Sequence, residues 1–213
     1  AGLKVDQVAI GSCTNSSYRE LATVARILRG KVAHPRVSFI VTPGSRQVLE
    51  NLARDGYLAD LLAAGARLTE SSCGFCIGGS HSPGSKGVSL RTSNRNFLGR
   101  SGTEDAEVYL VSPETAAAAV ATGVITDPRD LGMDCPAVAM PDRFRVDDCM
   151  ILEPAPPERA ASVEILRGPN IGDPPENGPM PERLSGEVTI KVGDKITTDH
   201  IMPAGARMKY RSN

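Results

Sequence analysis

The sequence predicts an α/β fold, a layered α/β/α domain built on a parallel β-sheet, over residues 1–130. Short apolar runs of strand length alternate with longer stretches whose apolar residues recur every three or four positions, as they do on one face of a helix. Glycines stand at the ends of these helical stretches. Strands that alternate with helices form parallel sheets with right-handed crossovers, so we expect helices packed on a sheet.

The first strand is expected at residues 5–10, and the helix after it ends at Gly30. The inward face of this helix is formed by four apolar residues with helical spacing (Leu21, Val24, Ala25 and Leu28). Polar residues 14–16 lie between strand and helix and are expected to cap the helix. A thiolate at Cys13 would be stabilised by the dipole of this helix.

The same unit then repeats along the chain. A second strand is expected at residues 37–42, followed by one or two helices within residues 46–64. Residues 66–69 are expected to form a third strand, and residues 108–111 a fourth. A serine, a proline and a glutamate then begin an alanine-rich helix that ends near Gly123, because these residues suit an N-cap and a first helical turn.

The composition changes after about residue 128. Prolines become dense, which excludes a long helix and predicts an extended connector over residues 131–185. Residues 188–192 alternate apolar and polar side chains, so we expect a strand that opens a further unit, the beginning of a swivel domain at residues 186–213. Because roughly thirty residues cannot bury a core of their own, the chain is expected to be part of a larger protein.

Charge and composition exclude several classes of protein. The net charge of −1 lacks a basic excess, and Lys and Arg are scattered, so no nucleic-acid partner is expected. Residues 1–6 lack the apolar region of a signal peptide, and the longest apolar stretch, residues 115–125, is too short to cross a bilayer, so no membrane partner is expected. Five cysteines, an odd number, are typical of a reducing compartment, and we expect a cytoplasmic protein.

Three cysteines follow the predicted strands. Cys13 comes after the first strand, and the pair Cys73 and Cys76, spaced as Cys-x-x-Cys, comes after the third. Because the carboxyl ends of parallel strands meet at one edge of a sheet, we expect three thiols at that edge. Three thiols without an obvious fourth ligand would leave an iron–sulfur cluster with one open iron, which can act as a Lewis acid.

Other chemistries are compatible with the same spacing. A redox dithiol needs a helix that begins at the pair, but two glycines follow it. Structural zinc needs a fourth ligand, for which the chain offers three candidates (His81, Cys135 and Cys149). Three half-buried core cysteines are a further alternative, although Cys73 and Cys76 lie among glycine and serine rather than leucine and valine.

A polar loop at residues 92–102 supplies cations. It contains Arg95 and Arg100, whose planar guanidinium groups suit bidentate recognition of carboxylates. Two loop arginines are by themselves ordinary surface residues, but their occurrence together with the thiols favours a site for an anionic substrate.

Four segments occur together in an order that has a counterpart in a known family. They are residues 11–16 (GSCTNS), 73–78 (CGFCIG), 93–100 (SNRNFLGR) and 196–201 (ITTDHI), the last followed by 203–205 (PAG). In this order they resemble the aconitase and isopropylmalate isomerase superfamily of iron–sulfur hydro-lyases. The first two resemble the segments with the cluster ligands, the third the substrate loop, and the fourth the opening of the mobile swivel domain.

The resemblance implies roles for individual residues. Cys13, Cys73 and Cys76 would be the ligands of a 4Fe–4S cluster. Arg95 and Arg100 would bind substrate carboxylates. Three more residues would lie near the site (Asn94, Asp199 and His200). The catalytic base of the family is expected outside this chain, so no base is assigned.

The resemblance also implies an activity, the isomerisation of citrate and isocitrate through cis-aconitate by dehydration and rehydration, a step of the tricarboxylic acid cycle. The partners would be the tricarboxylate substrate and the missing domains of the same enzyme, and the isolated chain is expected to be inactive. Continuation into a connector and a swivel opening favours aconitase or homoaconitase over an isopropylmalate isomerase. Phe75, where aconitases typically have proline, leaves the substrate open. A zinc-stabilised α/β binding module is the non-catalytic alternative, and it would bind zinc without iron.

Overall fold

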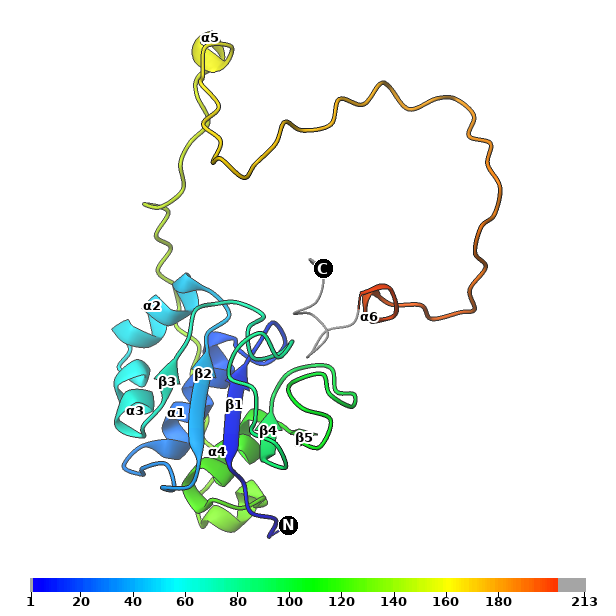
Figure 1. Cartoon of the computed structure of the whole chain (residues 1–213). Coiled ribbons are helices and arrows are strands. Elements are labelled where there is room, and N and C mark those ends of the chain that lie inside the picture. The colour runs from blue at the N-terminus through cyan, green and yellow to red at the C-terminus, as the bar shows by residue number, and fades with distance from the viewer. Residues whose placement is uncertain (1, 203–213) are drawn as a thin grey trace. The chain divides into compact units, whose positions relative to one another are not determined.

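A computed structural model of the chain describes residues 2–202 and shows a five-stranded sheet in the order β3-β2-β1-β4-β5 (Figure 1). All neighbouring strands of this sheet are parallel. The strands are β1 (Gln7–Gly11), β2 (Ser38–Thr42), β3 (Arg67–Leu68), β4 (Val88–Arg91) and β5 (Glu107–Leu110). The prediction of an α/β domain with a parallel sheet is therefore confirmed.

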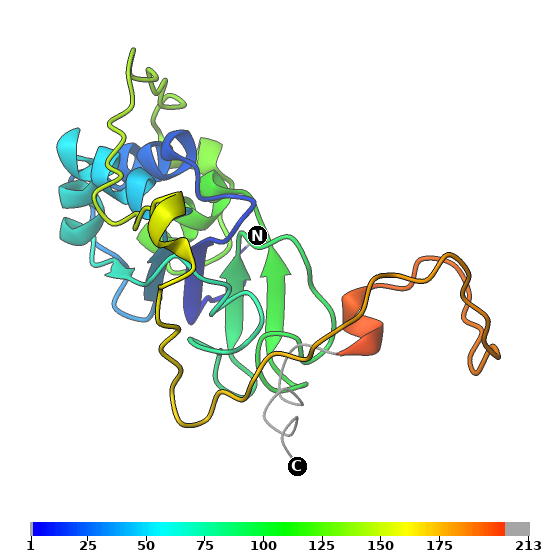
Figure 2. The same ribbon diagram turned by 90° about the horizontal axis from the view of Figure 1, so that it is seen from above.

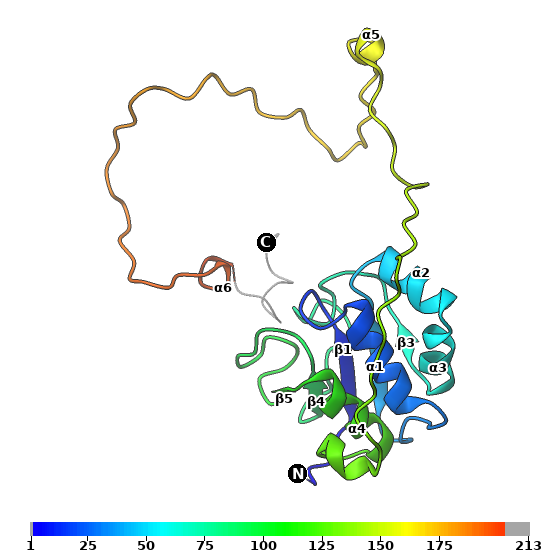
Figure 3. The ribbon, with the colours of Figure 1, turned by 180° about the vertical axis from the view of Figure 1, so that it is seen from behind.

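Helices pack on one face of this sheet, as Figures 2 and 3 show. They are α1 (Tyr18–Leu28), α2 (Arg46–Arg54), α3 (Tyr57–Ala63) and α4 (Pro113–Thr122), followed by the 3₁₀ helix η1 (Pro128–Leu131). Val8 and Ile10 of β1 join Phe39 and Val41 of β2 in the core that faces the helices. Alternate residues point to this face because the side-chain period of a strand is two.

The opposite face of the central strands is covered by a loop. Ala9 of β1 and Ile40 of β2 pack against Phe75, which belongs to the segment between β3 and β4. Gln7, Ser89 and Arg91 are joined by hydrogen bonds on this same side. The Cys-x-x-Cys segment therefore lies against the sheet itself.

Three local predictions were wrong. No strand was expected between residues 69 and 108, but β4 forms there and pairs with β1 and β5. The N-cap of α1 is Ser17, which forms a capping box with Glu20, and not one of residues 14–16. Residues 188–192 form no strand in the described chain and are largely exposed, because no neighbouring strand there supplies the ladder of hydrogen bonds.

Asp147–Ile196 is a unit distinct from the one with the sheet, because its residues contact mainly one another. It contains the short helix α5 (Pro157–Ala160), and most of its residues are exposed. The short helix α6 (Thr198–Ile201) follows. Residues 203–213 of the predicted swivel opening at 186–213 lie outside the described residues, and they include the segment 203–205 of the family resemblance. Among residues 2–202 no helix is both long and apolar enough to cross a membrane.

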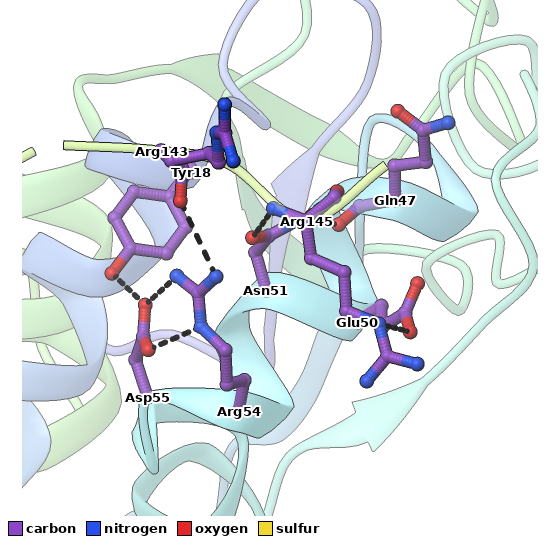
Figure 4. A network of polar contacts seen from close by, with 8 residues as sticks. All are labelled: Tyr18, Gln47, Glu50, Asn51, Arg54, Asp55, Arg143 and Arg145. Carbon is purple, nitrogen blue, oxygen red and sulfur yellow. Dashed lines mark hydrogen bonds and ion pairs between the residues drawn. The ribbon is translucent and has the colours of Figure 1, made fainter. Parts of the chain in front are cut away.

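The chain that leaves the domain is held on α2 by a side-chain clamp (Figure 4). Asn51 is buried, and its amide donates to the Arg145 carbonyl at 3.0 Å and accepts from the Arg145 N–H at 2.8 Å. Phe144 packs edge-on against Tyr18 with ring centres 5.5 Å apart. Asn51 therefore pairs with this segment as a neighbouring strand would.

Candidate functional site

Cys13 lies in the loop between β1 and α1, and its side chain is exposed. This loop is tied to the end of β4. The Thr92 hydroxyl accepts a hydrogen bond from the Gly11 N–H at 2.8 Å, and the Thr92 carbonyl accepts one from the Asn15 side-chain amide at 2.6 Å. The carboxyl ends of β1 and β4 are thus joined directly beneath Cys13.

Cys73 and Cys76 lie in a series of tight turns after β3. The Cys73 carbonyl accepts from the Ile77 N–H at 3.1 Å, and the Gly74 carbonyl accepts from the Gly79 N–H at 2.9 Å. Cys73 is exposed, whereas Cys76 is buried. The turns therefore place one thiol of the pair at the surface and the other against the domain.

Arg100 contacts Cys76 directly. It is 4% exposed, donates from Nε to the Cys76 carbonyl at 3.0 Å, and its Nη2 lies 3.7 Å from the Cys76 sulfur. Its guanidinium also lies over the Phe97 ring, 5.4 Å from the centroid. Arg100 lines a cavity of ≈ 200 Å³ formed by the loop after β4. The guanidinium thus contacts both the backbone and the sulfur of this cysteine.

Arg91 is the site residue that the sequence analysis missed. It is completely buried beneath the cysteine segment and donates to the carbonyls of Phe75 and His81. Burial lowers the pKa of Arg91 to about 10, while the charge of Cys76 opposes this shift. The alternation Val-Ser-Leu-Arg between Gly87 and Thr92 was the signal for β4 and for an inward-facing arginine.

Three buried hydroxyls flank the cysteine segments without a hydrogen-bond partner among the described residues. They belong to Ser12, Ser93 and Ser101. Ser12 precedes Cys13, and the backbone of Ser101 lies 3.1 Å from where a Cβ of Gly78 would be. Buried hydroxyls normally have partners, so these three indicate that the edge of the sheet suits a polar group.

The remaining predicted residues are dispersed. Asn94 and Arg95 are exposed on the loop after β4. His200 accepts through Nδ1 from the Thr197 N–H at 3.1 Å, which is a local capping contact of α6. Asp199 belongs to α6, but its side chain lies outside what the structure describes.

The three cysteines are not gathered into one ligand set. Within residues 2–202, no three Cys, His, Asp or Glu side chains are close enough together to hold one metal ion. This holds equally for the zinc alternative, since His81, Cys135 and Cys149 form no such group with the cysteine pair among the described residues. The donor chemistry nevertheless fits an iron–sulfur cluster, because free thiols, buried guanidinium groups and unpartnered hydroxyls occur at the same edge of the sheet.

The sequence matches the Aconitase family (aconitate hydratase) over residues 1–123. The matched range includes all three candidate cysteine ligands and the loop with Arg95 and Arg100. Residues 196–201 lie outside it.

Similar proteins include large subunits of two kinds of enzyme. The chain is 50% identical over 133 residues to the homoaconitase large subunit of Thermus thermophilus, which covers 61% of this chain and 31% of that protein. It is 45% identical over 130 residues to the 3-isopropylmalate dehydratase large subunit of Wolinella succinogenes, which covers 61% of this chain and 31% of that protein. It is 47% identical over 129 residues to 3-isopropylmalate dehydratase large subunit 1 of Methanopyrus kandleri, which covers 60% of this chain and 31% of that protein. The chain thus spans less than a third of the length of these relatives. Because the family match includes more than half of the chain and all three candidate ligands, this protein belongs to the aconitase family.

Proposed function

We propose that this chain carries the iron–sulfur site of a hydro-lyase that removes water from, and returns it to, a hydroxy-polycarboxylate. The observation that carries the proposal is the contact of buried Arg100 with Cys76, at the edge of the sheet to which the Cys13 loop is also tied. Family membership supports the reaction class.

In this proposal Cys13, Cys73 and Cys76 hold a 4Fe–4S cluster. When bound, the cluster supplies a Lewis acid for the hydroxyl that leaves. Arg100 contacts the sulfur of Cys76 and borders the cavity of the substrate loop. Arg95, which is exposed on the same loop, is the proposed donor to a substrate carboxylate.

The proposed substrates are hydroxy-acids with two or three carboxylates. The names of the relatives favour the reactions of homoaconitase or 3-isopropylmalate dehydratase, and the citrate and isocitrate pair, with cis-aconitate between them, is the alternative within the class. The test is perturbation of the visible spectrum of the iron-loaded chain by each acid, with acetate as control. The role of this loop would be contradicted if no polycarboxylate changed the spectrum. It would also be contradicted if the spectral change were the same in an Arg95→Gln variant.

Because the chain spans less than a third of its relatives, the complete reaction is proposed to need further domains that supply the catalytic base. We propose the division into the cysteine-bearing domain at 1–130, the connector at 131–185 and the opening of a swivel domain at 186–213. A position of Asp199 and His200 near the assembled site belongs to the same proposal.

The proposal is tested by anaerobic reconstitution of the chain with iron and sulfide. The wild type is compared with Cys13→Ser and with Cys135→Ser, a matched change of an exposed cysteine outside the site. We expect bound iron and sulfide, with a broad visible charge-transfer band, in the wild type and in Cys135→Ser, and their loss in Cys13→Ser. Stoichiometric zinc without iron, unaffected by Cys13→Ser, would instead support the binding-module alternative and overturn the assignment.

A further inference from the structure

Among residues 2–202, the acceptors of the buried Arg91 guanidinium are all neutral. Its Nε donates to the Ser89 hydroxyl at 3.1 Å, and its Nη2 donates to the Gln7 side-chain oxygen at 2.8 Å. Its other acceptors are the backbone carbonyls of Phe75 and His81. No described carboxylate pairs with it, although buried charges in proteins are normally paired.

The two carbonyls that Arg91 binds lie on either side of Cys76 in the sequence. Phe75 precedes this cysteine, and His81 ends the turns that follow it, with the His81 carbonyl 2.8 Å from Nη2. The Phe75 ring packs on the guanidinium, 5.5 Å from its centre. The planar group thereby ties the cysteine segment to β4 and, through Gln7, to β1.

Among the described residues, Cys76 is the ionisable group whose charge acts on Arg91. Arg100 contacts the same sulfur at 3.7 Å, and its Nε donates to the carbonyl of the same residue. One buried guanidinium therefore contacts this sulfur, and a second binds backbone carbonyls on either side of the same cysteine, whereas Cys13 and Cys73 are exposed to water. The charge environment of the three thiols is unequal.

We infer that Arg91 is a positioning residue that fixes the Cys73–Cys76 segment on the sheet, and that its buried charge is the counter-charge of Cys76 and of the iron–sulfur cluster bound there. The second part rests on the function proposed above. Positive charge and hydrogen bonds near the sulfur ligands raise the reduction potential of such clusters, so removal of this charge lowers the potential.

Two substitutions separate position from charge. Arg91→Lys keeps the charge but lacks the planar fork that reaches both carbonyls. Gln7→Glu keeps Arg91 and introduces a carboxylate at the atom that now accepts from Nη2, so the charge is neutralised in place; it also removes the hydrogen bond from Gln7 Nε2 to the His81 carbonyl. Gln47→Glu on α2 adds the same charge outside the site and is the matched control.

The positional role is measured on the metal-free chain by amide hydrogen exchange of residues 74–82. We expect exchange to be at least tenfold faster in Arg91→Lys and to rise less in Gln7→Glu, which loses one hydrogen bond to His81 but keeps the fork on both carbonyls. Unchanged exchange in a folded Arg91→Lys variant would overturn the positional role. If Arg91→Lys does not fold, a Ser89→Ala variant, which removes the acceptor of Arg91 Nε and so loosens the fork, is used, and unchanged exchange there overturns the positional role.

The role of the charge is measured as the midpoint potential of the reconstituted chain. We expect a more negative potential in Gln7→Glu, and wild-type values in Arg91→Lys and Gln47→Glu. Equal potentials in Gln7→Glu and Gln47→Glu would overturn the role of the charge. A wild-type chain that takes up no iron and sulfide would overturn both the proposed function and the role of the charge, whereas the exchange measurement still decides the positional role.

Discussion

Gly11 lies where β1 meets the loop with Cys13, and its backbone adopts a φ of +135°. A Cβ at this position would lie 2.1 Å from the Thr42 carbonyl oxygen of the neighbouring strand. Only glycine permits both the conformation and the approach of the two backbones. The position of Cys13 at the edge of the sheet thus depends on one residue without a side chain.

For that reason we expect Gly11→Ala to lower the free energy of unfolding by roughly 3 kcal/mol. Gly30→Ala is the matched control, since Gly30 also has a positive φ, but no atom lies within 4 Å of where its Cβ would be. The control should cost about 1 kcal/mol. Urea denaturation measures both, and equal losses would show that the approach to Thr42 is unimportant.

Asp55 is a second residue whose environment decides its chemistry. Its hydrogen bonds with Arg54 and with the Tyr18 hydroxyl lower its pKa to about 2. Burial and the bond to Asp55 raise the pKa of Tyr18 above its ordinary value. The ionised carboxylate is therefore stabilised by folding.

Since the pKa of Asp55 is lower in the folded than in the unfolded chain, its contribution is complete above the unfolded pKa of 3.8 and is lost as the pH falls through the folded pKa of about 2. We expect Asp55→Asn to cost about 1 kcal/mol at pH 7, after allowance for partial solvent screening, and progressively less as the pH falls from about 4 to below 2. Denaturation at a series of pH values, with Asp105→Asn as control for net charge, checks this. A loss that does not depend on pH would contradict it.

At the scale of elements, β4 organises the site. It pairs with β1, and on the face away from the helices it presents Ser89 and Arg91 to the cysteine segment. Leu90, between them, points into the core under the helices. One short strand therefore serves the hydrophobic core and the site at once, through the alternation of its side chains.

The two hydrogen bonds between Asn51 and Arg145 hold an irregular segment on α2. Their loss should make that segment more accessible to a protease. We expect Asn51→Ala to make trypsin cleavage after Arg143 and Arg145 at least fivefold faster, because the backbone there is released. Gln47→Ala, one turn earlier on α2, should leave the rate unchanged. Time courses read by mass spectrometry measure the rates, and no acceleration in Asn51→Ala would exclude the clamp.

At the scale of the whole molecule, the chain combines a packed domain with a segment that has little core. Nearly all the apolar residues of Asp147–Ile196 are exposed, including Leu152 at 92%. Such a segment gains little from hydrophobic burial, so it is expected to open far more easily than the sheet.

Limited trypsin digestion should therefore cut the chain first within 147–196, after Arg159, Arg167 and Arg183. Cleavage after Arg26, which lies in α1, should be slower by at least tenfold. Intact-mass analysis of early time points identifies the products. Simultaneous cleavage in α1 and in 147–196 would show that the two units are equally protected.

The parallel sheet, its helices and the loops that carry the cysteines could be predicted from the sequence, because each depends on local pattern. Apolar spacing marks α1, the serine and proline before α4 mark its start, and Gly123 marks its end. The order of family-like segments likewise identified the family, which the match over residues 1–123 confirms.

Other features depended on contacts between distant parts of the chain. A four-residue strand such as β4 is defined by its neighbours, and residues 188–192 show that the same alternation without neighbours forms no strand. The contacts of Arg91 with Phe75 and of Arg100 with Cys76 likewise join residues that are 16 and 24 positions apart in the sequence. Local periodicity and motifs were enough to predict the fold class and the candidate ligands. The burial of one thiol beside a guanidinium could not be predicted in this way, because desolvation and charge pairing depend on packing across the sheet.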